Sequence, residues 1–236
     1  MKENILGIDV CPFSMEETLH EAEKIIVNKE KGFIVAINPE KIMKGQKDLE
    51  LKKLLNSANI QIPDGVGVVI ASKLKRGRIK KRVTGIDLMM NLCDLASKKG
   101  YKIYMLGAAP NIAESAMGEL KKKFPSLIVS GVNDGYFKDN EKQVIDNIYN
   151  SNSDILFVAL GSPRQEYWIK QNIDNLNVPL IMGVGGSFDV ICGNIKRAPA
   201  WMRKCGLEWL YRLISEPWRF KRMMVLPKFL IKALLS

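Results

Sequence analysis

The sequence has few of the residues from which protein metal sites are built. His20 is the only histidine, and the four cysteines, Cys11, Cys93, Cys192 and Cys205, are scattered without a C-x-x-C pair. Structural zinc and c-type haem sites need such ligands at short spacing, so neither is expected. We therefore expect a protein without a metal centre or other cofactor.

Long apolar runs are also missing. No stretch approaches the roughly 20 residues that a membrane-spanning helix needs, and the longest runs, such as residues 66–71, suit buried strands or helix starts. Residues 1–10 contain acids and no long apolar run, which argues against a secretory signal. The expected location is the cytoplasm, with the protein bound peripherally to the inner face of the cell membrane.

The positive charge is concentrated at the C-terminal end. Residues 196–236 hold ten Lys or Arg against two Glu, or +8 of the total formal charge of +11, which leaves +3 for residues 1–195. The aromatic side chains of Trp201, Trp209 and Trp218 alternate with arginines in this stretch, a pattern typical of interfacial helices. We predict a core of residues 1–195 and a basic, aromatic-rich helical appendage, residues 196–236, that contacts an anionic membrane surface.

Other interpretations of the appendage remain. Leucines at helical spacing also fit a helix pair packed on the core, and an apolar tail can bury itself against another subunit to form a homo-oligomer. Basic and aromatic residues also suit nucleic acid, but the chain has no known nucleic-acid-binding motif, so no nucleic-acid partner is expected.

The first 195 residues alternate short β-branched runs with longer amphipathic segments. This pattern predicts an α/β, Rossmann-like fold, a mostly parallel sheet with helices on both faces. Ser14 and Glu17 form an S-x-x-E capping box at one helix start. Strands are predicted at residues 33–37, 102–106, 128–132, 155–159 and 180–184, and helices at residues 14–28, 87–99, 111–124, 141–150 and 164–172.

The dinucleotide-binding fingerprint G-x-G-x-x-G is absent. The turn at residues 107–110, between a predicted strand and helix, is open to two interpretations: a site for a phosphate or ribose at the helix N-terminus, or a plain βα turn. An acidic residue about 20 positions further on, which a ribose contact would need, is also missing. An NAD-dependent oxidoreductase is therefore disfavoured.

Four polar clusters are candidate sites, because α/β folds place their sites where strands end. Asn38-Pro39-Glu40 directly follows the predicted strand at residues 33–37, and residues 161–166 follow the one at residues 155–159. Residues 63–67 place an acid in a glycine-flanked turn just before an apolar segment, and residues 82–87 form the fourth cluster. Each of them also fits an ordinary cap or turn, and Asp87 in particular fits a helix N-cap.

Taken together, these clusters carry a family resemblance. The chain resembles the WecG/TagA/CpsF glycosyltransferases along its whole length, and most closely the TagA branch. One departure is Ala36, where many members have threonine in T-x-N. The matching motifs, in order, are INPE at 37–40, PDG at 63–65, RVTG at 82–85, GYF at 135–137, GSPRQE at 161–166, GGSFD at 185–189, RAP at 197–199 and GLEW at 206–209.

The resemblance implies a reaction. The TagA branch transfers N-acetylmannosamine from UDP-N-acetylmannosamine to undecaprenyl-diphosphate-N-acetylglucosamine, forming the β-1,4 linkage of the teichoic acid linkage unit. The WecG branch uses the uronic acid of the same sugar, which stays an alternative. A second alternative is a binding module for a UDP-sugar or a lipid head group that has no turnover.

The chemistry needs a base for the acceptor hydroxyl and positive charge for the leaving diphosphate. Asp64, held between Pro63 and Gly65, is the expected base, and no D-x-D motif is present to hold a metal, so Arg82 is expected to stabilise the diphosphate. Gln165 completes the predicted catalytic set. The predicted substrate-binding residues are Asn38, Thr84, Tyr136, Gly186, Asp189, Arg212, Arg219 and Arg222.

Overall fold

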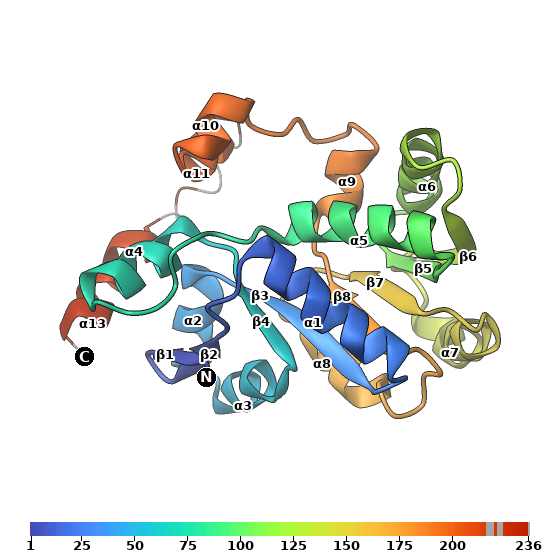
Figure 1. Ribbon diagram of the computed structural model, residues 1–236, viewed down its shortest axis with the longest axis horizontal. Coiled ribbons are helices and arrows are strands. Elements are labelled where there is room, and N and C mark those ends of the chain that lie inside the picture. Colours follow the sequence, from blue (N-terminus) through green and yellow to red (C-terminus); the bar gives the residue numbers. More distant parts are fainter. Residues whose placement is uncertain (216–219, 221–223, 236) are drawn as a thin grey trace.

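The computed structural model describes residues 1–215, 220 and 224–235, with all of their side chains except those of Lys204 and Arg212. Its centre is a six-stranded sheet in the order β4-β3-β8-β7-β5-β6, in which every neighbouring pair is parallel (Figure 1). The strands are β3 (Gly32–Ile37), β4 (Ile60–Pro63), β5 (Lys102–Gly107), β6 (Ile128–Asn133), β7 (Ile155–Ala159) and β8 (Leu180–Gly183). A separate antiparallel hairpin joins β1 (Glu3–Ile5) to β2 (Ile8–Val10).

The sheet separates two apolar cores, because successive side chains of a strand point to opposite faces. In β7, Leu156 and Val158 enter one core, and Ile155 and Phe157 enter the other. The second core is covered by α1 (Met15–Val27), α5 (Gly85–Lys99), α6 (Ile112–Lys123) and α9 (Ser187–Ile191). The first is covered by α2 (Pro39–Gly45), α3 (Leu49–Ser57), α4 (Val66–Leu74), α7 (Glu141–Asn150), α8 (Arg164–Asn172) and α13 (Val225–Leu235).

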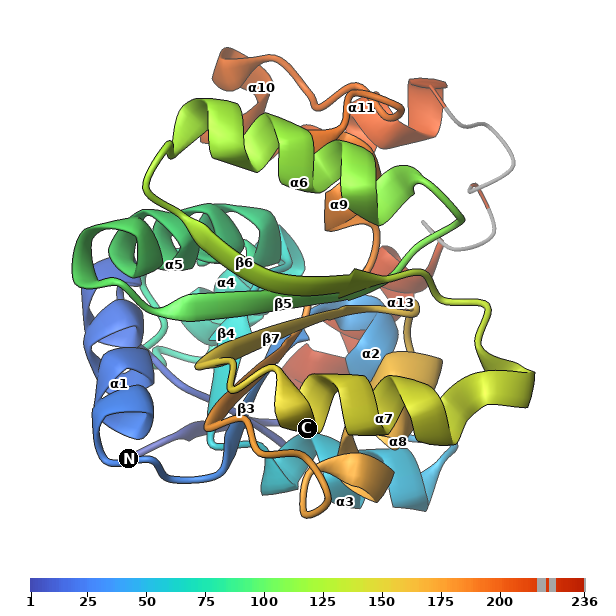
Figure 2. The ribbon, with the colours of Figure 1, turned by 90° about the vertical axis from the view of Figure 1, so that its right-hand side faces the viewer.

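Figure 2 shows this layering, with α5 and α6 above the sheet and α3, α7 and α8 below it. The predicted fold class is confirmed. All five predicted strands and all five predicted helices are present within a few residues of their expected ends. Ser14 caps α1 in the predicted capping box, its hydroxyl accepting a hydrogen bond from the Glu17 amide.

One sequence-based interpretation is wrong in detail. Asp87 is not a helix N-cap: α5 begins at Gly85, Thr84 is its N-cap, and the Thr84 hydroxyl accepts a hydrogen bond from the Asp87 amide. The predicted strand at residues 128–132 is β6, which lies at the edge of the sheet and leaves Ile128 43% exposed.

The C-terminal part of the chain forms α10 (Ala200–Lys204), α11 (Glu208–Ser215) and α13. Of these, α13 packs on the body of the protein, against α2 and α4. Phe229 and Ala233 of α13 are fully buried in the first core. The boundary at residue 195 stays a prediction. Within the described residues, no helix is both long enough and apolar enough to cross a membrane.

Candidate active site

A cavity of about 450 Å³ opens at the carboxyl edge of the sheet. Its walls come from the segments that follow β3, β4, β7 and β8, which is where parallel α/β sheets place their ligands. The C-terminal part of the chain closes it with Gly206, Trp209, Val225 and Leu226. Its polar lining residues are Asn38, Glu40, Lys41, Asp64, Arg82, Thr84, Ser162, Gln165, Ser187 and Glu208.

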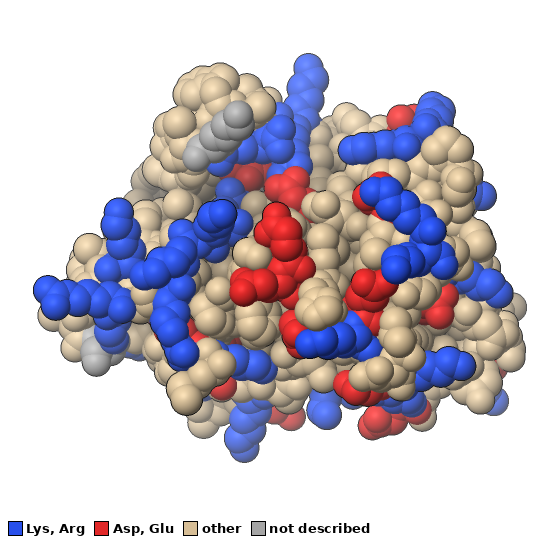
Figure 3. Space-filling model, viewed as in Figure 1, with Lys and Arg blue, Asp and Glu red and all other residues tan. Residues whose placement is uncertain are grey.

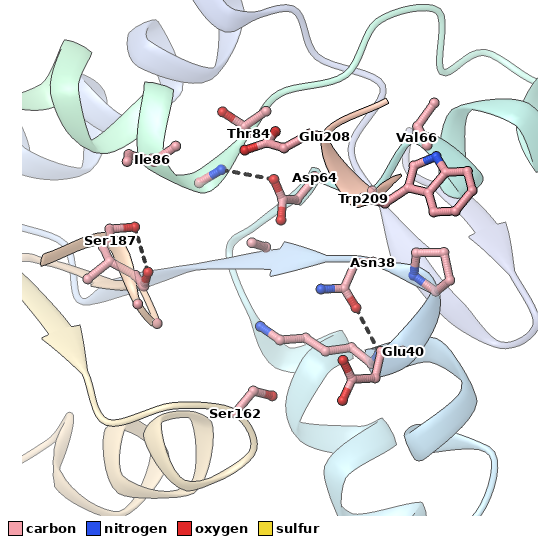
Figure 4. Close-up of a pocket in the computed structure, with 18 of the residues that line it drawn as sticks. Asn38, Glu40, Asp64, Val66, Thr84, Ile86, Ser162, Ser187, Glu208 and Trp209 are labelled. Atoms are coloured by element: carbon pink, nitrogen blue, oxygen red, sulfur yellow. Dashed lines mark hydrogen bonds between the residues drawn. The ribbon is translucent and has the colours of Figure 1, made fainter. Parts of the chain in front are cut away.

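Asp64 presents a carboxylate to this cavity. It follows the last residue of β4, and its amide donates to the carbonyl of Ile37 at the end of β3. One carboxylate oxygen accepts a hydrogen bond from the Gly85 amide at 3.1 Å. The other points into the open space that the Asn38 amide nitrogen also faces (Figure 4). One oxygen is therefore fixed by the protein, and the other is available to a ligand.

Gly65 allows the two loops of the site to approach each other. A β-carbon at this position would lie 2.5 Å from Cδ of Pro39 and 3.1 Å from Cβ of Asn38, which is too close for any other residue. Asn38 is the N-cap of α2, and its side-chain oxygen accepts from the Lys41 amide at 2.9 Å. This cap leaves the Asn38 amide nitrogen directed at the cavity (Figure 4).

Arg82 connects Asp64 to the C-terminal part of the chain. Its Nε donates to the backbone carbonyl of Asp64, and its Nη2 lies 3.8 Å from Asp64 Oδ1. The same Nη2 donates to Glu208 Oε2 at 3.0 Å. The side chain of Glu208 is only 5% exposed, so its charge is removed from water and compensated by the arginine.

A second arginine extends this network. Arg197 donates through both terminal nitrogens to the carboxylate of Asp87 at 2.7 and 2.8 Å, and its Nε lies 3.8 Å from Glu208 Oε1. Burial works to raise the pKa of Asp87, but hydrogen bonds from Arg197 and Thr84 outweigh it and hold that pKa below its ordinary value. Three carboxylates and two guanidiniums thus join residues 197 and 208 to the loops of Asp64 and Thr84.

A buried ion pair forms the opposite wall. Lys41 Nζ lies 2.7 Å from Glu166 Oε1, with both side chains less than a tenth exposed. The same carboxylate oxygen accepts from Gln165 Nε2 at 3.0 Å, and Gln165 Oε1 accepts from the Gly185 amide at 3.0 Å. Gln165 is 2% exposed, so its amide is held in one orientation at the edge of the cavity.

The structure brings together six of the predicted site residues. Asn38, Asp64, Arg82, Thr84, Gln165 and Gly186 all line the cavity. Tyr136 and Asp189 are not among its lining residues, and Tyr136 is 76% exposed. Arg212 lies in α11, and its side chain is not among those described. Arg219 and Arg222 lie outside the described residues.

Tyr136 belongs to a second polar region, beyond the cavity. The Gly135 amide donates to the carbonyl of Ala108 in the β5–α6 turn at 2.9 Å. Arg164, at the start of α8, donates to the carbonyl of Gly135 at 3.0 Å. The turn after β5, the segment around Tyr136 and the start of α8 therefore meet at the same edge of the sheet as the cavity.

Sequence reasoning missed Lys41 and Glu208 as parts of the site. Lys41 directly follows the motif at residues 37–40 and lies in the same first helical turn, and this proximity could have indicated that it belongs to the site. The C-terminal 41 residues contain ten basic residues and only two acids, one of which is Glu208. An isolated acid in a basic segment indicates an ion pair with a particular cationic side chain.

A parallel sheet with a polar, partly closed cavity at its carboxyl edge defines an α/β protein whose ligand binds across the strand ends. A model of the family described as "Glycosyl transferase WecG/TagA/CpsF family" matches residues 3–236, and the chain belongs to this family. It is therefore a glycosyltransferase.

Two curated relatives are similar along nearly the whole chain. Both carry the name N-acetylglucosaminyldiphosphoundecaprenol N-acetyl-beta-D-mannosaminyltransferase. The protein from Bacillus subtilis (strain 168) is 36% identical over 233 residues, covering 98% of this chain and 91% of the relative. The protein from Bacillus spizizenii is 36% identical over 228 residues, covering 96% of this chain and 88% of the relative.

Proposed function

We propose that this protein transfers N-acetylmannosamine from UDP-N-acetylmannosamine to undecaprenyl-diphosphate-N-acetylglucosamine with inversion at the sugar carbon, forming a β-1,4 linkage. The names of the two Bacillus relatives support this sugar and this acceptor. The main structural support is the position of Asp64. Its carboxylate is 26% exposed at the cavity and lies beside the guanidinium of Arg82.

The proposed reaction is a single displacement. Asp64 accepts the proton of the acceptor hydroxyl, and the hydroxyl oxygen forms a bond to C1 of the donor sugar. The bond between C1 and the diphosphate oxygen breaks, and UDP leaves with that electron pair. Attack on the face opposite the leaving group inverts the configuration at C1.

The leaving diphosphate needs positive charge. Arg82 lines the cavity, but it already contacts Glu208 and Asp64, so part of its charge is compensated within the protein. We therefore propose that Arg212, Arg219 and Arg222 supply further charge to the diphosphates of donor and acceptor. No D-x-D occurs in the sequence, and we propose that these arginines replace a metal ion.

Neutral groups are proposed to orient the sugars. Asn38, Thr84 and Gln165 line the cavity and offer amides or a hydroxyl to the acetamido group and sugar hydroxyls. Tyr136, Gly186 and Asp189 are proposed to hold the nucleotide. The position of Tyr136 beside the β5–α6 turn supports this, since that turn precedes a helix N-terminus.

The protein is proposed to work at the cytoplasmic face of the membrane, bound peripherally through its C-terminal residues. Trp201 and Ile214 are more than half exposed in the described part of this region and suit the headgroup boundary. In the absence of a membrane, the same apolar side chains are proposed to drive self-association.

The decisive test supplies purified protein with UDP-N-acetylmannosamine or its uronic acid, and with a water-soluble N-acetylglucosaminyl diphosphate lipid, with and without EDTA. We expect a disaccharide product from the neutral donor in both conditions. Product from the uronic acid donor alone would identify the protein as a transferase of the uronic acid. Donor binding without product in either condition would make the protein a binding module, and rescue of chelated enzyme by magnesium would contradict metal independence.

A further inference from the structure

The segment after α4 carries a dense positive charge outside the C-terminal region. Six of the nine residues from 73 to 81 are Lys or Arg and none is acidic, which gives the segment +6, whereas the remainder of residues 1–195 sums to −3. All six are exposed: Lys73, Lys75, Arg76, Arg78, Lys80 and Lys81. Figure 3 shows positive side chains gathered at this end of the molecule.

The segment is held in a defined shape by the N-terminal hairpin. One carboxylate oxygen of Glu3 accepts from the amides of Arg78 and Ile79 at 2.7 and 3.1 Å, and from the Ser72 hydroxyl at 2.9 Å. The side chain of Ile79 is 1% exposed and fixes the segment to the first core. The cationic side chains therefore project from a fixed backbone instead of a loose loop.

Apolar side chains adjoin these cations. Ile70 and Leu74, one helical turn apart on α4, are 38% and 54% exposed. The neighbouring helix α13 exposes Ile231 and Leu235 together with Lys232. Cations mixed with exposed aliphatic side chains are typical of surfaces that lie in a lipid headgroup layer. A nucleic acid would bind the cations, but the exposed aliphatic side chains would add nothing to its affinity.

The same two helices reach the cavity. The first turn of α4 lines it with Val66 and Gly67, and the first turn of α13 lines it with Val225 and Leu226. Figure 1 shows α4 and α13 side by side, and α4 ends at Leu74, within the start of the basic segment. Contact at their far ends would therefore hold the cavity close to the plane of the headgroups.

We propose that residues 73–81, with Ile70 and Leu74, form a surface of the core that binds anionic phospholipid headgroups directly. The inference rests on one part of the proposed function, namely that the acceptor is a lipid and therefore lies in a membrane. This surface is separate in sequence from the C-terminal residues and adds a second contact, which fixes the orientation of the protein as well as its attachment.

The test is sedimentation of the full-length chain with vesicles of phosphatidylcholine containing phosphatidylglycerol. We expect the triple variant Lys73→Glu, Arg76→Glu and Lys81→Glu to bind about tenfold more weakly or worse. The matched control is Lys121→Glu, Lys142→Glu and Lys170→Glu, which changes the net charge equally at exposed lysines of α6, α7 and α8. The control should bind as the parent does, and both variants should keep full transfer to the water-soluble acceptor.

Equal losses in the two triple variants would mean that only net charge matters and would overturn the proposal. Unchanged binding in the first variant would overturn it as well, as would a loss of binding to RNA that exceeds the loss of vesicle binding. Failure of the parent to transfer sugar to the soluble acceptor would instead contradict the proposed function, because that assay contains no membrane.

Discussion

Glu208 Oε2 and Arg82 Nη2 lie 3.0 Å apart, and they join the C-terminal part of the chain to the loop of the proposed base. The same Nη2 is 3.8 Å from Asp64 Oδ1, so one guanidinium is shared between two carboxylates. Because Glu208 holds the shorter contact, it draws Arg82 away from full pairing with Asp64. The contact with Glu208 therefore limits the positive charge that Arg82 presents to Asp64.

Glu208→Gln is expected to lower turnover on the soluble acceptor about tenfold or more, because Arg82 then pairs with Asp64 and weakens it as a base. The loss is expected in kcat, with donor KM and thermal stability nearly unchanged. Glu119→Gln removes an exposed carboxylate paired with Lys122 and serves as the control. A loss of turnover that only matches a loss of folded protein would indicate a role in folding alone.

Arg82→Lys tests whether the planar guanidinium is needed. Arginine contacts the Asp64 carbonyl through Nε and Glu208 through Nη2, and one ammonium on a different stem does not reproduce both contacts. We expect turnover to fall about tenfold or more with the charge retained, and thermal unfolding to show whether the fold is kept. Near-parental turnover would show that Arg82 acts only as a point charge.

Asp87→Asn tests the ion pair with Arg197 through stability. The pKa of Asp87 is held below its ordinary value, so the folded state binds this proton more weakly than the unfolded chain does. The stabilisation is therefore full above the ordinary pKa near 4 and declines as the pH falls toward the lower folded value. With the carboxylate 39% exposed, solvent screening limits the effect on the free energy of unfolding to about 1 kcal/mol.

Urea unfolding of the parent and Asp87→Asn at pH 7 and pH 3 measures this directly. The difference in unfolding free energy should be present at pH 7 and shrink at pH 3. A difference that is the same at both values would assign the effect to the Thr84 cap instead of the ion pair.

The role of the C-terminal arginines is best tested by single substitutions. Deleting residues 196–236 would remove Phe229 and Ala233 from the first core and Glu208 from Arg82, so loss of activity would not distinguish a catalytic role from unfolding. Arg212→Glu and Arg219→Glu are each expected to lower transfer to the soluble acceptor at least about tenfold. Full activity in both would restrict these arginines to membrane attachment.

The amphipathic helices and the strands between them were predictable from the sequence, but the short elements were not. A strand such as β7 is a run of five apolar residues that includes the β-branched Ile155 and Val158, and it lies between two helical patterns. The strand β4 has only four residues, one of them Gln61, whose buried amide is satisfied by the carbonyls of Leu55 and Ala58. No local pattern indicates such a partner, because the contact depends on how α3 ends.

The site was predictable at Asn38, which follows a predicted strand, and at Asp64, which lies in a turn between Pro63 and Gly65. It was not predictable where two distant segments meet. Glu208 reaches Arg82 across 126 positions, and Lys41 reaches Glu166 only after α2 and α8 pack beside the same cavity. Both pairs depend on tertiary packing, which spacing along one chain does not encode.

Whether Asp64 is the base for sugar transfer is decided by the turnover of Asp64→Asn with UDP-N-acetylmannosamine and the soluble diphosphate acceptor. The substitution keeps the shape of the side chain and its contact with the Gly85 amide but removes the base. We expect turnover to fall about 100-fold or more with donor affinity nearly unchanged. Near-full turnover of Asp64→Asn across neutral pH would show that Asp64 is not the base.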